Sequence, residues 1–130
     1  MAQKYINDGY LIVPEIFDQT TVENIQSEIP KFLDGTYPVN NPAGNKDSGL
    51  LAVHFPHWVS RPIFETLDHP RIKEVLQIIV GAHIPHWDGR VKCMQSMLFL
   101  KPPGFPGQAW HQDERFIATR DRSLVGVWIA

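Results

Sequence analysis

Apolar residues recur every three or four positions along two stretches of the first two thirds of the chain. One stretch follows Asp18, and the other covers residues 71–80. This spacing places apolar side chains on one face of a helix. Asp18 or Thr20 can cap the start of the first helix, and Gly81 suits the end of the second. The pattern therefore predicts two amphipathic helices that each bury one face.

Further helix signals lie on either side of the first stretch. Residues 4–8 form a short predicted helix closed by Gly9, and Ser60 followed by Pro62 marks the start of another. Pro30 lies inside the helix that follows Asp18, where proline costs about 3 kcal/mol. We therefore expect that helix to break or kink near Ile29.

The pattern changes after about residue 90. Val91 to Lys101 is a predicted strand whose apolar side chains occupy both faces, and Trp110 to Phe116 is a second. Leu124 to Ala130 is predicted to be a buried strand in which the chain ends. Between the helices and these strands, residues 34–49 are rich in Gly, Pro, Asn and Asp and are predicted to form a loop. Helices followed by strands predict an α+β fold with an incomplete sheet.

Composition narrows the classes of protein that are compatible with this pattern. The chain has 12 basic and 14 acidic residues, a net charge of −2, and no basic stripe that would favour nucleic acid. No apolar run approaches the roughly 20 residues that span a bilayer, and the N-terminus lacks the apolar core of a signal peptide. The single cysteine, Cys93, cannot form an internal disulfide and is expected to be a packing residue. We expect one cytoplasmic domain over residues 1–130 that binds neither nucleic acid nor a membrane.

His111 and Asp113 are the candidate site residues. In a strand, residues two apart point to the same face, so the imidazole and the carboxylate would meet while Gln112 points away. Non-haem Fe(II) oxygenases bind iron through two His and one carboxylate. No His occurs among the 17 residues after Asp113. Either the pair is accidental, or the chain is the front part of an enzyme, and we favour the second interpretation.

Four blocks of sequence extend this interpretation. They are Gln95–Leu98, Lys101–Pro103, Trp110–Glu114 and Gly126–Ala130, and in order and spacing they resemble the phytanoyl-CoA dioxygenase family. The opening stretch, Tyr5 to Val13, also resembles the start of that family. The resemblance covers essentially the whole chain.

The resemblance implies an Fe(II)- and 2-oxoglutarate-dependent oxygenase on a double-stranded β-helix, or jelly roll, with a helical region to about residue 90. His111 and Asp113 would be two iron ligands, and Met97 and Trp128 would line the 2-oxoglutarate pocket. The family's distal His and its Arg would follow Ala130. Lys46 is the nearest candidate for an upstream lysine that touches 2-oxoglutarate, but its loop cannot be aligned and the position stays unassigned.

Other polar residues have simpler interpretations. His54 with His57, and His83 with His86, are each separated by a proline and are interpreted as loop residues rather than a second metal site. Glu114 is expected to be solvated on the opposite strand face. The arginines of the C-terminal region could meet a charged substrate, but a charged turn is preferred; they are Arg115, Arg120 and Arg122. Met97 and Trp128 could instead be core residues, with the pocket role preferred, whereas for Gln95 the pocket and a hydrogen-bonded place in the core are equal alternatives.

The leading hypothesis is a dioxygenase that hydroxylates a small or medium organic substrate. The alternatives are a non-catalytic, truncated relative that binds a ligand or partner, and an unrelated jelly-roll binding protein. Because strands of such a sheet lose neighbours when it is incomplete, we also expect inactivity of the isolated chain and self-association through unpaired strand edges.

Overall fold

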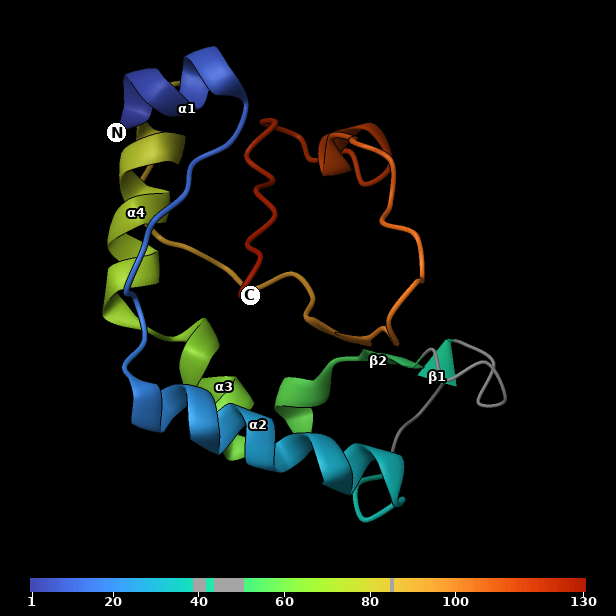
Figure 1. The fold of residues 1–130 in the computed structure, drawn as a ribbon. Helices are drawn as coiled ribbons and strands as arrows, with labels where there is room; N and C mark the ends of the chain where they lie inside the picture. Colours follow the sequence, from blue (N-terminus) through green and yellow to red (C-terminus); the bar gives the residue numbers. More distant parts are fainter. Residues whose placement is uncertain (39–41, 44–50, 85) are drawn as a thin grey trace. The chain divides into compact units, whose positions relative to one another are not determined.

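The computed structural model describes residues 1–38, 42–43, 51–84 and 86–130. The chain forms two compact units (Figure 1). The first unit comprises Met1–Ile12, Lys73–Val91 and Pro106–Ala130, and the second comprises Val13–Ile72 and Lys92–Phe105. The elements follow in the order α1 (Ala2–Asp8), α2 (Gln19–Leu33), β1 (Pro42–Ala43), β2 (Leu51–His54), η2 (Pro56–Trp58), α3 (Arg61–Leu67), α4 (Pro70–Gly81), β3 (Met97–Leu100) and η3 (Asp113–Arg115).

The predicted helix ends are confirmed where a local cap defines them. Asp18 caps α2, since its side chain accepts a hydrogen bond from the backbone N–H of Thr21 at 2.8 Å. Ser60 caps α3 in the same way, accepting from Ile63 N at 3.4 Å. Gly9 closes α1 with a φ of 75°, a left-handed conformation that glycine adopts without steric cost. No helix among the described residues is long and apolar enough to cross a membrane.

The predicted break of α2 at Pro30 is wrong. The helix continues through Pro30 to Leu33, and the carbonyl oxygen of Pro30 still accepts from Asp34 N at 2.9 Å. Pro30 lies near the C-terminal end of α2, so few helical hydrogen bonds are disturbed. Phe32, which is buried, anchors the last turn to the core of the second unit. Packing therefore outweighs the local cost of proline.

A three-stranded antiparallel sheet of order β1-β2-β3 lies in the second unit. Leu51 pairs with Leu100 and His54 with Met97. The strand predicted over residues 91–101 is thus confined to the four residues of β3, because β2 offers four pairing partners. β1 falls within the predicted loop of residues 34–49, much of which, including Lys46, lies outside the described residues.

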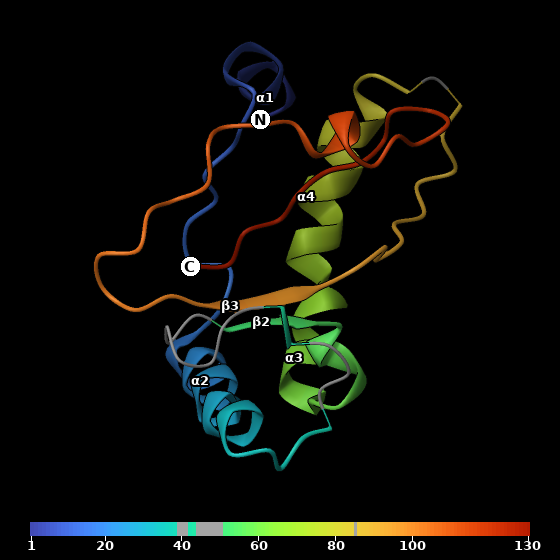
Figure 2. The ribbon, with the colours of Figure 1, turned by 90° about the vertical axis from the view of Figure 1, so that its right-hand side faces the viewer.

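The core of the second unit is formed where this sheet meets two helices. Phe32 from α2, Val53 from β2 and Ile63 from α3 are buried together. Figure 2 shows β2 and β3 side by side across α2 and α3. The second unit therefore consists of a small sheet on a helical layer, while the predicted jelly roll and the single domain stay predictions.

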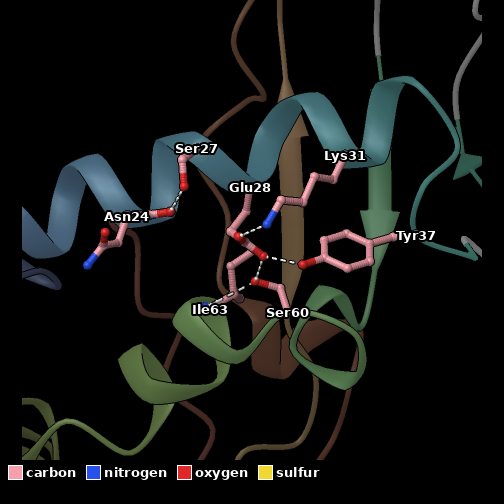
Figure 3. A network of polar contacts seen from close by, with 7 residues as sticks. All are labelled: Asn24, Ser27, Glu28, Lys31, Tyr37, Ser60 and Ile63. Atoms are coloured by element: carbon pink, nitrogen blue, oxygen red, sulfur yellow. Dashed lines mark hydrogen bonds and ion pairs between the residues drawn. The ribbon is translucent and has the colours of Figure 1, made fainter.

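A buried carboxylate connects the elements of this unit (Figure 3). Glu28 in α2 is 3% exposed. Its side chain accepts hydrogen bonds from Lys31 Nζ at 2.6 Å, Tyr37 OH at 2.5 Å and Ser60 Oγ at 2.7 Å. Burial alone would raise the pKa of Glu28, but these three hydrogen bonds outweigh it and the pKa is lowered. The charged carboxylate is therefore the form that holds α2, the following turn and the start of α3 together.

The two strands predicted in the first unit are absent from its described residues. Residues 110–116 contain the short helical turn η3, and residues 124–130 form no strand. A strand requires a hydrogen-bonded neighbour, and neither segment has one among the described residues. The predicted burial of the last segment is also wrong, since Val127 is 51% and Trp128 74% exposed.

Candidate metal-binding site

His111 and Asp113 lie together in the first unit. His111 Nε2 is 3.2 Å from Asp113 Oδ1. The predicted proximity is confirmed, but the strand geometry given for it is wrong. Gln112 is extended, with φ −108° and ψ 123°, and Asp113 then starts η3, in which Phe116 N donates to Asp113 O at 2.9 Å. An extended residue followed by a tight turn brings the carboxylate to the imidazole.

The backbone fixes the orientation of the imidazole. His111 Nδ1 lies 2.8 Å from the carbonyl oxygen of Ala109. Because a carbonyl oxygen can only accept a hydrogen bond, Nδ1 carries a proton, and in the neutral form of the ring Nε2 would offer its lone pair. Metal-binding histidines are commonly oriented by this kind of contact through their second nitrogen. His111 is thus arranged to offer Nε2 to a metal on the side where Asp113 lies.

The distance between the two donor atoms fits a shared metal ion. Two ligands at about 2.0–2.2 Å from one ion, at a right angle, lie about 3 Å apart. The Nε2–Oδ1 distance of 3.2 Å agrees with that value. Within the described part of the chain, no group of three or more His, Cys, Asp or Glu side chains could hold a metal. The residues present therefore fit two of the three protein ligands of a facial iron site.

Gly126 approaches the other oxygen of the Asp113 carboxylate. A Cβ atom placed on Gly126 would lie 2.8 Å from Asp113 Oδ2 and 3.8 Å from Cγ. The first of these distances is shorter than a real Cβ contact, so a side chain at position 126 would displace the carboxylate. The absence of a side chain at Gly126 therefore leaves room for the Asp113 carboxylate in its present position.

The side chain of Glu114 accepts hydrogen bonds from neighbouring residues, so the prediction that it is solvated is wrong. Its Oε1 accepts from Thr119 N at 2.5 Å and from Thr119 Oγ1 at 2.7 Å, and its Oε2 accepts from Leu124 N at 3.0 Å. These hydrogen bonds, above all those from Thr119, lower the pKa of Glu114 and keep it charged. No sequence pattern indicates these hydrogen bonds, since the donors lie five and ten residues downstream in irregular structure.

A sequence model of the family described as phytanoyl-CoA dioxygenase (PhyH) matches residues 5–130. The chain belongs to the phytanoyl-CoA dioxygenase family. No curated protein and no solved structure matches it in the corresponding comparisons. Phytanoyl-CoA dioxygenase family members are generally Fe(II)- and 2-oxoglutarate-dependent oxygenases. Membership therefore indicates an oxygenase type of function for the chain, and the His111–Asp113 pair is the feature of its structure that suits such chemistry.

An open hollow of about 1010 Å³ borders His111 in the first unit. Aromatic rings line much of it: Tyr10 and Trp110 have ring centroids 6.2 Å apart, and Phe116 stands edge-on to His111 at 5.8 Å. Its lining comprises Asp8, Gly9, Tyr10, Gln108, Ala109, Trp110, His111, Gln112, Arg115 and Phe116.

The two residues predicted to line a 2-oxoglutarate pocket belong to different units. Met97 lies in β3 of the second unit and is partly buried, with Gln95 Nε2 4.0 Å from its sulfur. Trp128 lies in the first unit and is exposed. Their roles in this phytanoyl-CoA dioxygenase family chain therefore stay predictions.

Two other histidines have polar contacts of their own. His57 Nδ1 is 2.5 Å from Ser96 Oγ, and burial lowers the pKa of this imidazole. His83 lies between two carbonyl oxygens, with Nδ1 3.2 Å from Ile79 O and Nε2 3.3 Å from Arg122 O. Cys93 is exposed, so its predicted packing role is wrong, because the strand expected to bury it begins only at Met97.

Proposed function

We propose that this chain belongs to an Fe(II)- and 2-oxoglutarate-dependent dioxygenase in which His111 and Asp113 are two of the iron ligands. One observation carries the proposal: His111 Nε2 and Asp113 Oδ1 are 3.2 Å apart, and Nδ1 of the same imidazole is occupied by Ala109 O. Family membership supports the choice of iron and 2-oxoglutarate. The product would be a hydroxylated small or medium organic molecule.

The residues of the chain have limited roles in this proposal. When bound, iron and 2-oxoglutarate supply the oxidising chemistry that places oxygen into a C–H bond. His111 contributes a neutral nitrogen donor, and Asp113 contributes an anionic oxygen that offsets charge on the metal. The aromatic hollow beside His111 would hold the substrate. Met97 and Trp128 would contact 2-oxoglutarate, and the third ligand and the arginine of the family remain to be assigned.

Metal binding tests the ligand pair directly. His111→Ala and Asp113→Ala should each abolish measurable Fe(II) binding under anaerobic conditions, since each leaves one ligand of the pair. Gln112→Ala is the matched control, because it lies between the two ligands but supplies neither donor atom. The measurement is equilibrium dialysis with metal analysis. Fe(II) bound equally well by the wild type and both ligand variants would show that the pair is not the site.

Binding of 2-oxoglutarate tests the proposed roles of Met97 and Trp128. Met97→Ala and Trp128→Ala should each raise the 2-oxoglutarate concentration needed to develop the charge-transfer absorption of its Fe(II) complex. Because Trp128 is 74% exposed, its replacement should change the free energy of unfolding by less than about 0.5 kcal/mol. Unchanged 2-oxoglutarate binding in both variants would remove the two residues from the pocket.

A further inference from the structure

We propose that Glu114 is a positioning residue for the metal site: by holding Thr119 and Leu124, its carboxylate keeps the backbone of Gly126 against Asp113. The inference rests on the proposed function, because it concerns how a proposed iron ligand is oriented. Glu114 touches neither His111 nor Asp113 in any contact described above. It acts through the segment that follows it.

The first step of the argument is the set of hydrogen bonds around Glu114. This residue is the middle residue of η3, directly after the candidate ligand Asp113. Both of its oxygens are occupied, Oε1 by the N–H and hydroxyl of Thr119 and Oε2 by the N–H of Leu124. Hydrogen bonds to a charged acceptor are about twice as strong as neutral ones. With its oxygens occupied, Glu114 does not compete with Asp113 for a cation.

The second step is the loop that these bonds close. Thr119 Oγ1 also accepts from Ser123 N at 3.0 Å, and Asp121 Oδ1 accepts from Ser123 Oγ at 2.6 Å. The loop between Thr119 and Leu124 is therefore stabilised by hydrogen bonds of its own. Through its hydrogen bonds to Thr119 and Leu124, Glu114 connects both ends of this loop to η3, the turn that contains Asp113.

The third step connects the loop to the ligand. Gly126 is two residues beyond Leu124, and a Cβ atom on it would lie 2.8 Å from Asp113 Oδ2. The backbone at Gly126 thus borders Oδ2, while Oδ1 faces His111 Nε2 at 3.2 Å. A carboxylate confined on one side in this way cannot turn freely away from the imidazole. Releasing Leu124 would release that confinement.

Mn(II) binding by the full 130-residue chain tests the proposal, with free Mn(II) measured by electron paramagnetic resonance. Glu114→Gln places an amide NH₂ where one oxygen accepts hydrogen bonds, so part of the contact to the loop is lost. Gly126→Ala keeps all three hydrogen bonds but places a methyl group against Asp113. Because the φ of Gly126 is not left-handed, alanine can adopt its backbone. Each variant should weaken Mn(II) binding by about 10- to 100-fold.

Glu23→Gln is the matched control. It makes the same change of charge at an exposed carboxylate of α2, whose hydrogen bond comes from Gln19. This variant should bind Mn(II) as the wild type does. Amide hydrogen exchange without metal gives a second measurement: Leu124 N–H should exchange faster in Glu114→Gln but not in Glu23→Gln.

The outcomes separate the two proposals. If the wild type binds Mn(II), and Glu114→Gln and Gly126→Ala bind it equally well, the positioning role is overturned and the ligand pair stands. If the wild type binds no Mn(II), hydrogen exchange decides the positioning role: unchanged exchange of Leu124 N–H in Glu114→Gln would overturn it. If Glu114→Gln fails to fold, as judged by circular dichroism, Thr119→Val decides, because it removes the hydroxyl hydrogen bond to Glu114 and leaves the Glu114 carboxylate in place.

Discussion

His57 is the histidine whose protonation is opposed by its surroundings. Burial lowers its pKa below the ordinary value of 6.5, and its Nδ1 lies 2.5 Å from Ser96 Oγ. The folded state therefore binds fewer protons at this site than the unfolded state does just below pH 6.5. Stability rises with pH where the unfolded state binds more protons, so His57 reduces stability as the pH falls through this window.

Replacing His57 should make stability less dependent on pH. His57→Asn keeps a side chain that can hydrogen-bond to Ser96 but removes the titrating group. Its unfolding temperature should fall less between pH 7 and pH 5.5 than that of the wild type. Circular dichroism melts at both pH values measure the difference. Parallel decreases in the two proteins would show that protonation of His57 does not contribute.

At the scale of single residues, the sequence predicted which residues form the candidate site better than it predicted their contacts. The His-x-Asp spacing predicted that His111 lies beside Asp113, but the two side chains meet through an extended Gln112 and a tight turn rather than along a strand. It could not indicate that Asp113 begins a helical turn, nor that Glu114 binds Thr119 and Leu124. Those contacts depend on how an irregular loop folds back toward Glu114, and the spacing of apolar residues does not indicate this.

At the scale of elements, the buried carboxylate of Glu28 links α2 to α3. Its hydrogen bond from Ser60 Oγ joins the middle of α2 to the residue that caps α3, and its bond from Tyr37 OH secures the turn after α2. Glu28→Gln should reduce the free energy of unfolding by about 1–3 kcal/mol, since it leaves buried donors with a poorer partner. Urea unfolding followed by circular dichroism measures this loss.

The contribution of Glu28 to stability should depend on pH in the acidic range. Because the folded pKa of Glu28 is lowered from 4.5, its contribution is fully present above that value and is lost as the pH falls through the folded pKa. The stability difference between the wild type and Glu28→Gln should therefore shrink below pH 4.5. Glu23→Gln, at an exposed position of the same helix, should differ little from the wild type at either pH. A difference that stays constant with pH would show that Glu28 acts without its charge.

Helices were predictable at this scale and strands were not. Asp18, Ser60 and Gly9 act on donors and acceptors within a few residues, so their caps can be identified without knowing the fold. A strand depends on a partner far away in the sequence: β3 has the length of β2, and the segment from Leu124 has no partner strand among the described residues. The predicted break at Pro30 is wrong for a similar reason, because the last turn of α2 is held by Phe32, which packs against residues far away in the sequence.

At the scale of the whole molecule, the prediction of self-association now depends on exposed side chains rather than on strand edges. Val127, Trp128 and Ile129 are consecutive, apolar and exposed. Exposed apolar residues that lie together commonly mark contact surfaces. A formal net charge of −2 adds little repulsion between copies of the chain.

A double variant tests this prediction. Val127→Ser with Ile129→Ser should shift the chain toward monomer in sedimentation velocity at increasing concentration, because two exposed apolar side chains become polar. Leu33→Ser, which changes an exposed apolar residue of α2, should sediment like the wild type. A wild-type chain that stays monomeric across the concentration range would contradict the prediction.

The exposure of the tryptophans has a consequence for spectroscopy. Of the four indoles in the sequence, Trp58, Trp110 and Trp128 are 69%, 94% and 74% exposed, and Trp87 is partly buried. Most of the emission of the folded chain should already be that of indole in water, so its wavelength should shift little on unfolding. Trp110 lines the hollow beside His111, so quenching of its emission should report a molecule entering there more clearly than fluorescence reports denaturation.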